Sequence, residues 1–343
     1  MTQSELSIDT MVEGLSEAEL CPPGLLQAQE EAHQRDIETL LWPREAEFVV
    51  VPCPACASQD SERVFTKFKL AYRTCRACGT LYMSPRPTEA VLRDFYEKSE
   101  AYLIWAEQIF PASEDARARK IHGPWFDRIV EACARYNVTR GRLLEVGPGF
   151  GTFAAIAQES GLFVDVSVVE PTPDLARRCR ARGLNVIEKP IELLQKMGAV
   201  DVVCSFEVIE HLFAPREFLL SCRRAMRENK LLVLSCPNGE GFDIATLGVK
   251  SLAVDAEHLN LFNPRSLTRL VESCGFMVRE VTTPGRLDAE FVRDAILSDD
   301  FDADSAFLRQ VLIDDWDRLG GPFQKFLADN GLSSHMWLVA TAR

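Results

Sequence analysis

A glycine-rich turn after an apolar segment constrains the fold of this chain more than any other feature. An apolar run that contains Glu145 is followed by Gly147, Gly149 and Gly151, and Thr152 opens the next periodic segment. Glycines permit backbone conformations closed to other residues and let a ligand approach the main chain closely. The pattern predicts a strand, a tight turn and a helix whose first amides face a bound ligand.

A second acid lies where a nucleoside-binding unit needs one. Val166 to Val169 has the pattern of a second strand and ends at Glu170, 25 residues after Glu145. In nucleoside-binding βαβ units, an acid about 20 residues beyond the glycine turn accepts hydrogen bonds from the ribose hydroxyls. A dinucleotide pattern, G-x-G-x-x-G, would require a third glycine at position 152, where this chain has Thr152.

The spacing Glu145-x-Gly147-x-Gly149-x-Gly151 resembles motif I of class I S-adenosylmethionine-dependent methyltransferases. The resemblance implies an enzyme that binds S-adenosyl-L-methionine, with Glu145 and the three glycines at the methionine end and Glu170 on the ribose hydroxyls. It assigns the rest of the cofactor pocket to Pro171 against the adenine, Ile191 at the adenine edge, and Phe206 and Glu207 as walls.

The chain after residue 140 alternates apolar strand patterns with helical ones, which predicts an α/β fold with helices on both faces of a sheet. The resemblance specifies a doubly wound, mostly parallel seven-stranded sheet whose last strand is antiparallel. We expect an acidic N-terminal arm and helix (1–45), a zinc ribbon (46–90), a helical linker (91–139) and a methyltransferase core (140–343). Residues 284–333 should form a helical lid inserted before the last strand.

Four of the eleven cysteines form two C-x₂-C pairs, Cys53/Cys56 and Cys75/Cys78, with eighteen residues between them. Paired knuckles at this separation predict a structural zinc site that uses all four thiolates, with no open position for catalysis. Gly79 after the second pair suits the left-handed backbone of such a turn. Six others lie in apolar patterns and are typical of buried thiols in a reducing compartment: Cys133, Cys179, Cys204, Cys222, Cys236 and Cys274.

Two roles for the ribbon remain open. Zinc-bearing ribosomal RNA methyltransferases use such a module on RNA, whereas sugar C-methyltransferases acting on nucleotide-linked deoxysugars also carry an N-terminal four-ligand zinc module. A net charge of −13 argues against a nucleic-acid backbone as the main partner, so we favour a small-molecule acceptor, most simply a carbohydrate. The alternatives are an RNA or protein methyltransferase that reads through the ribbon, or a cofactor-binding scaffold without activity.

Two histidine segments should lie near the catalytic edge of the sheet. Glu257-His258 resembles the Glu-His-phenylalanine segment of the sugar C-methyltransferases, which implies His258 as the base and Glu257 as the acid that orients it. A structural or substrate-orienting role for His258 is the alternative. Glu210-His211 resembles a segment of ubiquinone-biosynthesis O-methyltransferases that can hold a divalent cation, although it also occurs as a helix opening beside the cofactor. His335 would be the next candidate base.

The ends and the composition exclude other classes of protein. The first twenty residues are polar and acidic, unlike a signal or transit peptide. No apolar run approaches the ~18 residues of a membrane span. The sequence therefore predicts a cytoplasmic protein without a membrane segment, and it leaves the oligomeric state open.

Overall fold

The computed structural model describes residues 15–22, 24–194 and 199–343. Its centre is a seven-stranded sheet with the order β10-β11-β8-β7-β4-β5-β6. Among the described strands of this sheet, β11 alone runs in the opposite direction to the others. The strands are β4 (Arg142–Val146), β5 (Asp165–Val169), β6 (Asn185–Ile187), β7 (Val200–Phe206), β8 (Met226–Pro237), β10 (Phe276–Thr282) and β11 (His335–Ala342).

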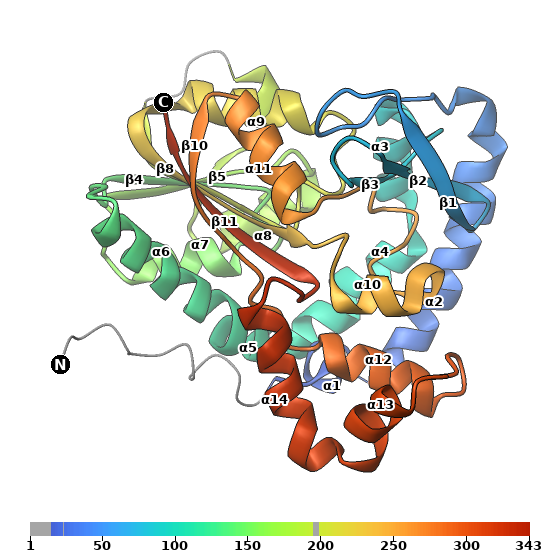
Figure 1. Cartoon of the computed structure of the whole chain (residues 1–343). Helices are drawn as coiled ribbons and strands as arrows, with labels where there is room; N and C mark the ends of the chain where they lie inside the picture. Colours follow the sequence, from blue (N-terminus) through green and yellow to red (C-terminus); the bar gives the residue numbers. More distant parts are fainter. Residues whose placement is uncertain (1–14, 23, 195–198) are drawn as a thin grey trace.

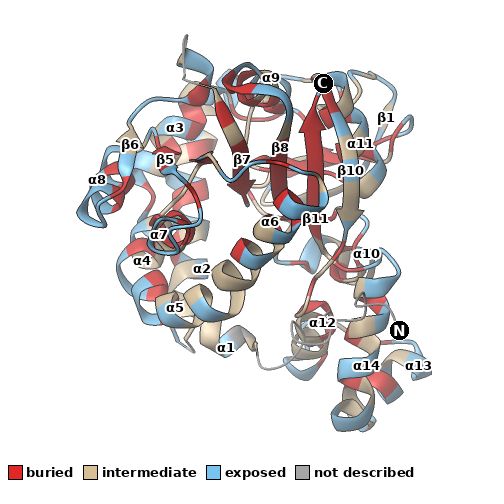
Figure 2. Cartoon of the chain, turned by 90° about the vertical axis from the view of Figure 1, so that its left-hand side faces the viewer, coloured by how far each residue is buried: buried red, intermediate tan, exposed pale blue. Residues whose placement is uncertain are grey.

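Helices cover both faces of the sheet. Successive residues of a strand point to opposite faces, so each strand contributes side chains to the core on both sides. Leu143 and Val202 pack with α6 (Gly123–Arg135) and α7 (Thr152–Glu159) on one face. Leu144 and Val203 pack with α9 (Pro215–Ala225) and α11 (Pro264–Ser273) on the other (Figure 1). The central strands β7 and β11 are buried almost throughout and β8 is buried from Leu231 on, whereas the edge strand β10 is partly exposed (Figure 2). Helix α8 (Pro173–Ala181) follows β5.

The N-terminal half adds helices and a second, smaller sheet. The small sheet has the order β1-β2-β3-β9, and its last strand comes from the loop after β8. Its strands are β1 (Ser61–Lys67), β2 (Leu70–Cys75), β3 (Leu81–Met83) and β9 (Asn260–Leu261). The helices are α1 (Glu17–Leu20), α2 (Leu25–Asp36), α3 (Glu89–Lys98), α4 (Glu100–Ile104) and α5 (Phe110–Arg117). Helix α6, in the segment expected to be a linker, covers the main sheet.

The segment between β10 and β11 is helical and has an apolar core of its own. Val292 and Leu312 are fully buried there, together with Leu247 of α10 (Phe242–Leu247). Its helices are α12 (Asp288–Leu297), α13 (Ala306–Arg309) and α14 (Trp316–Asp329), which lie together at the bottom of Figure 1. The segment starts where β10 ends, with Thr282 opposite Trp337 of β11, and it ends at His335, which pairs with Pro237 at the carboxyl end of β8.

The predicted fold class is confirmed, including the antiparallel last strand. Helix α11 is capped at its start: the Asn263 side chain accepts a hydrogen bond from the Ser266 amide, and Pro264 opens the helix. Strand β8 begins earlier than its apolar half indicates, since Glu228 to Lys230 extend it as polar residues. Within the described part of the chain, no helix has the length and apolar character needed to cross a membrane. Of the predicted acidic arm and helix over residues 1–45, residues 1–14 and 23 lie outside the described residues.

Candidate active site

The glycine turn joins β4 to α7 at the carboxyl edge of the parallel strands. Gly147, Gly149 and Gly151 all have positive φ, at 75°, 55° and 77°. A side chain at Gly147 would place its Cβ 2.6 Å from Val208, so glycine is required there by space as well as by conformation. The Gly147 amide donates to Val169 at 3.0 Å, which ties the turn to the end of β5. Ligands of open α/β sheets bind at this edge.

Two buried carboxylates lie at this turn. Glu145 and Glu170 are 3% and 4% exposed. Burial raises the pKa of Glu145 to about 8, opposed by a backbone hydrogen bond from Ala154, and raises the pKa of Glu170 to about 7, opposed by hydrogen bonds from Thr172. Within the described residues, Oε2 of Glu145 has no hydrogen-bond partner. A buried unpaired carboxylate oxygen costs about 1–3 kcal/mol or more, so it fits a site completed by a ligand with donor groups.

The other predicted cofactor residues surround the same edge. Ile191 is buried, Phe206 is nearly buried at the end of β7, and Pro171 is exposed after Glu170. Glu207 has a φ of 53°, a left-handed conformation that is strained for a residue with a side chain. Its carboxylate accepts from the Ser235 hydroxyl at 2.6 Å and lies 3.7 Å from Nδ1 of His335.

The surroundings of His258 differ from the sequence prediction. Nδ1 of His258 lies 2.8 Å from the carbonyl of Ala253 and 3.3 Å from Asp255. Glu257 instead lies 3.5 Å from Nδ1 of His33, and burial raises the pKa of Glu257 to about 8. The adjacent residue in sequence therefore does not orient the imidazole: the acid beside His258 is Asp255. The backbone turn through Asp255 explains this, since its side chain accepts from the amides of both Glu257 and His258.

Glu210 and His211 meet His258 across two loops. The rings of His211 and His258 are 4.7 Å apart, and the three residues offer possible metal-ligand atoms that all lie within 4.8 Å of one another. Both carboxylate oxygens of Glu210 are buried without a hydrogen-bond partner in the described part of the chain, and one lies 3.7 Å from Nε2 of His211. Burial and neighbouring His258 lower the pKa of His211 to about 3. Tyr96 contacts Nδ1 of His211 at 3.2 Å, a neighbour that no sequence motif indicated.

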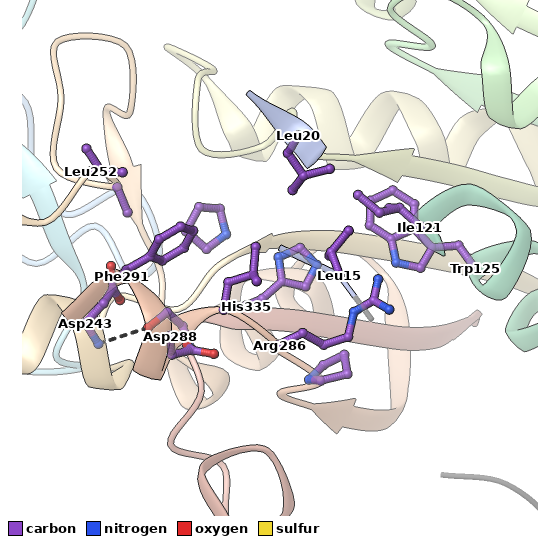
Figure 3. A pocket seen from close by; sticks show the side chains of 16 residues that line it. Leu15, Leu20, Ile121, Trp125, Asp243, Leu252, Arg286, Asp288, Phe291 and His335 are labelled. Atoms are coloured by element: carbon purple, nitrogen blue, oxygen red, sulfur yellow. Dashed lines mark hydrogen bonds between the residues drawn. The ribbon is translucent and has the colours of Figure 1, made fainter. Parts of the chain in front are cut away.

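A cavity of about 260 Å³ opens near the same edge, between β8, β11, α12 and the start of the described chain (Figure 3). Leu20, Ile121, Trp125 and Phe291 supply apolar walls, and His335 stands among them. The Trp125 and His335 rings are nearly parallel, with centroids 6.1 Å apart. The sequence placed His335 on this edge, but it gave no sign that the α1 region would close the cavity.

Two polar atoms facing this cavity region are buried without partners among the described residues: Nε2 of His335 and Oδ1 of Asp243. The second Asp243 oxygen accepts from Ser251 at 2.6 Å. Burial raises the pKa of Asp243. Both atoms are suited to accept hydrogen bonds from hydroxyl or amino groups of a ligand.

The four predicted metal ligands are brought together. Cys53, Cys56, Cys75 and Cys78 offer sulfur atoms within 4.8 Å of one another, with Sγ–Sγ distances of 3.5 Å for Cys53–Cys78 and 3.6 Å for Cys56–Cys75. Sulfurs around a tetrahedral zinc with ~2.3 Å bonds are about 3.8 Å apart. The geometry therefore fits one tetrahedral zinc ion. Gly79 has the predicted left-handed conformation, with φ of 76°.

The ribbon is fixed to the loop that carries His258. Strand β9 pairs with β3, and the Tyr72 hydroxyl donates to the carbonyls of Asp255 and His258. Asn263 donates to the carbonyl of Cys78 at 3.0 Å. The cysteine cluster thus holds one side of the catalytic edge.

Comparisons with known proteins agree with this geometry. Residues 117–281 match a family described as a methyltransferase domain. A protein of Mycolicibacterium smegmatis named as a probable S-adenosylmethionine-dependent methyltransferase is 29% identical over 160 residues, which cover 46% of this chain and 59% of that protein. A protein of Mycobacterium tuberculosis with the same description is 27% identical over 157 residues, covering 46% and 54%.

The chain thus spans between half and two thirds of the length of the curated relatives it matches. A solved S-adenosylmethionine-dependent methyltransferase from Clostridium acetobutylicum covers 70% of this chain and 96% of its own, at 9% identity and a TM-score of 0.45. Because this similarity is low, the fold is assigned from the order and direction of the strands in the sheet.

Proposed function

We propose that this chain, whose residues 117–281 match a methyltransferase domain family, is a class I S-adenosylmethionine-dependent enzyme that transfers a methyl group to a small-molecule acceptor. The observation that carries the proposal is the pair of buried acids, Glu145 and Glu170, on either side of the glycine turn. Glu145 would accept from the amino group of the methionine moiety and Glu170 from the ribose hydroxyls. When bound, S-adenosylmethionine supplies an electrophilic methyl group on a sulfonium.

Most of the work left to the protein is alignment and exclusion of water, because the methyl donor is already activated. The glycine turn and the two acids would hold the cofactor, with Pro171, Ile191, Phe206 and Glu207 around its remaining parts. An acceptor that must lose a proton needs a base near the same edge. His258 remains the residue that the sequence proposes, with Asp255 rather than Glu257 beside its ring, and His335 is a rival because it lines the cavity.

We further propose that the acceptor is carbohydrate-like. A cavity of about 260 Å³ is large enough for a single sugar ring, and a nucleotide-linked sugar would place its sugar there. Trp125 and Phe291 offer apolar surfaces for a ring face, and the unpaired atoms of Asp243 and His335 would accept from its hydroxyls. The four cysteines would hold a structural zinc ion that keeps the His258 loop in place.

Calorimetric titration with S-adenosylhomocysteine, the product form of the cofactor, tests the proposed function. Glu170→Ala removes a charged acceptor worth roughly 1.5–3 kcal/mol, so affinity should fall about tenfold or more. The matched control is Glu159→Ala, an exposed glutamate at the end of α7, which should bind as the unaltered protein does. No binding by the unaltered protein would refute methyl transfer, and equal binding by Glu170→Ala would remove the ribose assignment.

A further inference from the structure

We infer that Tyr102, which lies before the matched domain, is an additional cofactor-binding residue whose hydroxyl contacts the ribose beside Glu170. The inference rests on the proposed function and adds a residue to the same site. The segment Glu100–Arg117 would then contact the cofactor directly through Tyr102.

The Tyr102 hydroxyl has no hydrogen-bond partner within the described residues, and the oxygen is buried. A buried hydroxyl without a partner is uncommon and costs about as much as a lost hydrogen bond, which points to a missing ligand atom. Burial and the nearby Glu170 carboxylate both raise the pKa of Tyr102, whereas Arg178 lowers it. The hydroxyl therefore stays protonated and can donate to an oxygen.

Aromatic contacts place Tyr102 over the cofactor turn. Its ring is 5.9 Å from that of Trp105, which is 5.2 Å from the ring of Phe150 in the glycine turn. Tyr102 also packs on the cluster that joins Phe150 to Leu175, at the start of α8 just after Glu170. The tyrosine thus lies between the two chain segments that are proposed to hold the cofactor.

The segment is anchored on the turn at several further points. Phe110 stacks on Phe150 with ring centroids 3.8 Å apart and planes 11° from parallel. Glu114 accepts from the Thr152 hydroxyl at 3.2 Å and pairs with Arg182. These contacts hold helix α5 against the first turn of α7 from outside the sheet.

The start of α4 is fixed as well, so the position of Tyr102 is determined by the fold. The buried Asp36 at the end of α2 accepts from the Ser99 hydroxyl at 2.7 Å and from the Ala101 amide at 2.9 Å. Ser99 in turn caps the helix by accepting from the Tyr102 amide at 2.9 Å. A residue held by both its backbone and its ring loses little freedom when it contacts a ligand.

Calorimetric titration of Tyr102→Phe with S-adenosylhomocysteine tests the inference, because the change removes one oxygen and keeps the ring. A neutral hydrogen bond corresponds to about a three- to tenfold loss of affinity. Adenosine, which has the ribose but no amino acid, should lose the same factor. Tyr136→Phe is the matched control: its hydroxyl bonds to Glu280 at the far end of the sheet, and the variant should bind normally.

The outcomes separate this inference from the proposed function. If the unaltered protein binds S-adenosylhomocysteine and Tyr102→Phe binds equally well, the tyrosine assignment is wrong and methyl transfer stands. If Tyr102→Phe loses affinity for S-adenosylhomocysteine but not for adenosine, the contact is not with the ribose and the inference fails as stated. Absence of binding by the unaltered protein would overturn both. Tyr102→Trp keeps an aromatic ring but fills the space, and it should weaken adenosine binding further.

Discussion

Replacing Glu145 by glutamine should stabilise the cofactor-free protein, and the gain should grow with pH. Burial raises the pKa of Glu145 from its ordinary 4.5 to about 8, and the Glu170 carboxylate adds to the rise. Between these pH values the folded protein keeps a proton that the unfolded chain has released. The free energy of unfolding therefore falls as the pH rises through this interval.

The size of the change in the free energy of unfolding follows from the difference between the pKa values of Glu145 in the unfolded and folded states. Each pH unit between the two pKa values is worth about 1.4 kcal/mol, so the acid lowers stability by up to ~3 kcal/mol near pH 7. Glutamine has nearly the shape of the protonated acid and does not ionise, so this cost disappears. The same variant should lose cofactor affinity, because an amide does not attract an ammonium group as a carboxylate does.

Urea unfolding of Glu145→Gln and the unaltered protein at several pH values measures the difference. We expect less than ~1 kcal/mol near pH 5, about 3 kcal/mol near pH 7 and about 4 kcal/mol near pH 8, with the variant more stable. Glu159→Gln, in which the replaced acid is exposed, should show no such trend. A difference that does not change with pH would refute the reasoning, because it would mean that the folded protein accommodates the ionised carboxylate.

Two further predictions concern the ribbon and the base. Cys75→Ser should reduce bound zinc, measured by elemental analysis, from about one equivalent to less than half. Hydrogen exchange should become faster in residues 255–263 as well as in the ribbon. Unchanged exchange in residues 255–263 would contradict the coupling between the ribbon and this loop. With an acceptor found by screening nucleotide-linked sugars, His258→Ala should keep S-adenosylhomocysteine affinity and melting temperature but lose about 10²–10⁴ in turnover. If His335→Ala alone shows that loss, the base is His335, and if neither does, the acceptor needs no imidazole base.

The sheet could be predicted because each strand carries its own local signal. Strand β7 is a short apolar run, the helix after Asn263 has its cap and proline in sequence, and the glycine turn marks the end of β4. A parallel strand that is buried on both faces is apolar at nearly every position, so its own sequence indicates it. An antiparallel last strand starts at the edge where the parallel strands end, which is why His335 could be expected there; the structure pairs it with Pro237.

Side-chain partners could not be predicted in the same way, because they depend on contacts between distant segments. Glu257 follows Asp255 by two residues, yet the turn sends it towards His33 and leaves Asp255 beside His258. Tyr102 lies in a helical stretch without a motif, and only the packing of its segment on Phe150 brings it to the cofactor edge. Adjacent position in sequence is a weak guide to which acid orients which histidine.

Separation in sequence also concealed the link between the ribbon and the catalytic loop. The ribbon was expected as an independent unit at residues 46–90, but its sheet is completed by β9 from the loop after β8. Arg86, at the end of the ribbon, is buried and donates to the Asn260 side chain at 2.8 Å and to the carbonyl of Phe213 at 2.6 Å. A closed four-thiolate site offers no coordination position for substrate, but zinc bound there would stabilise the ribbon and, through these bonds, the backbone that positions His258. Structural zinc in this arrangement would therefore influence activity through the geometry of a loop.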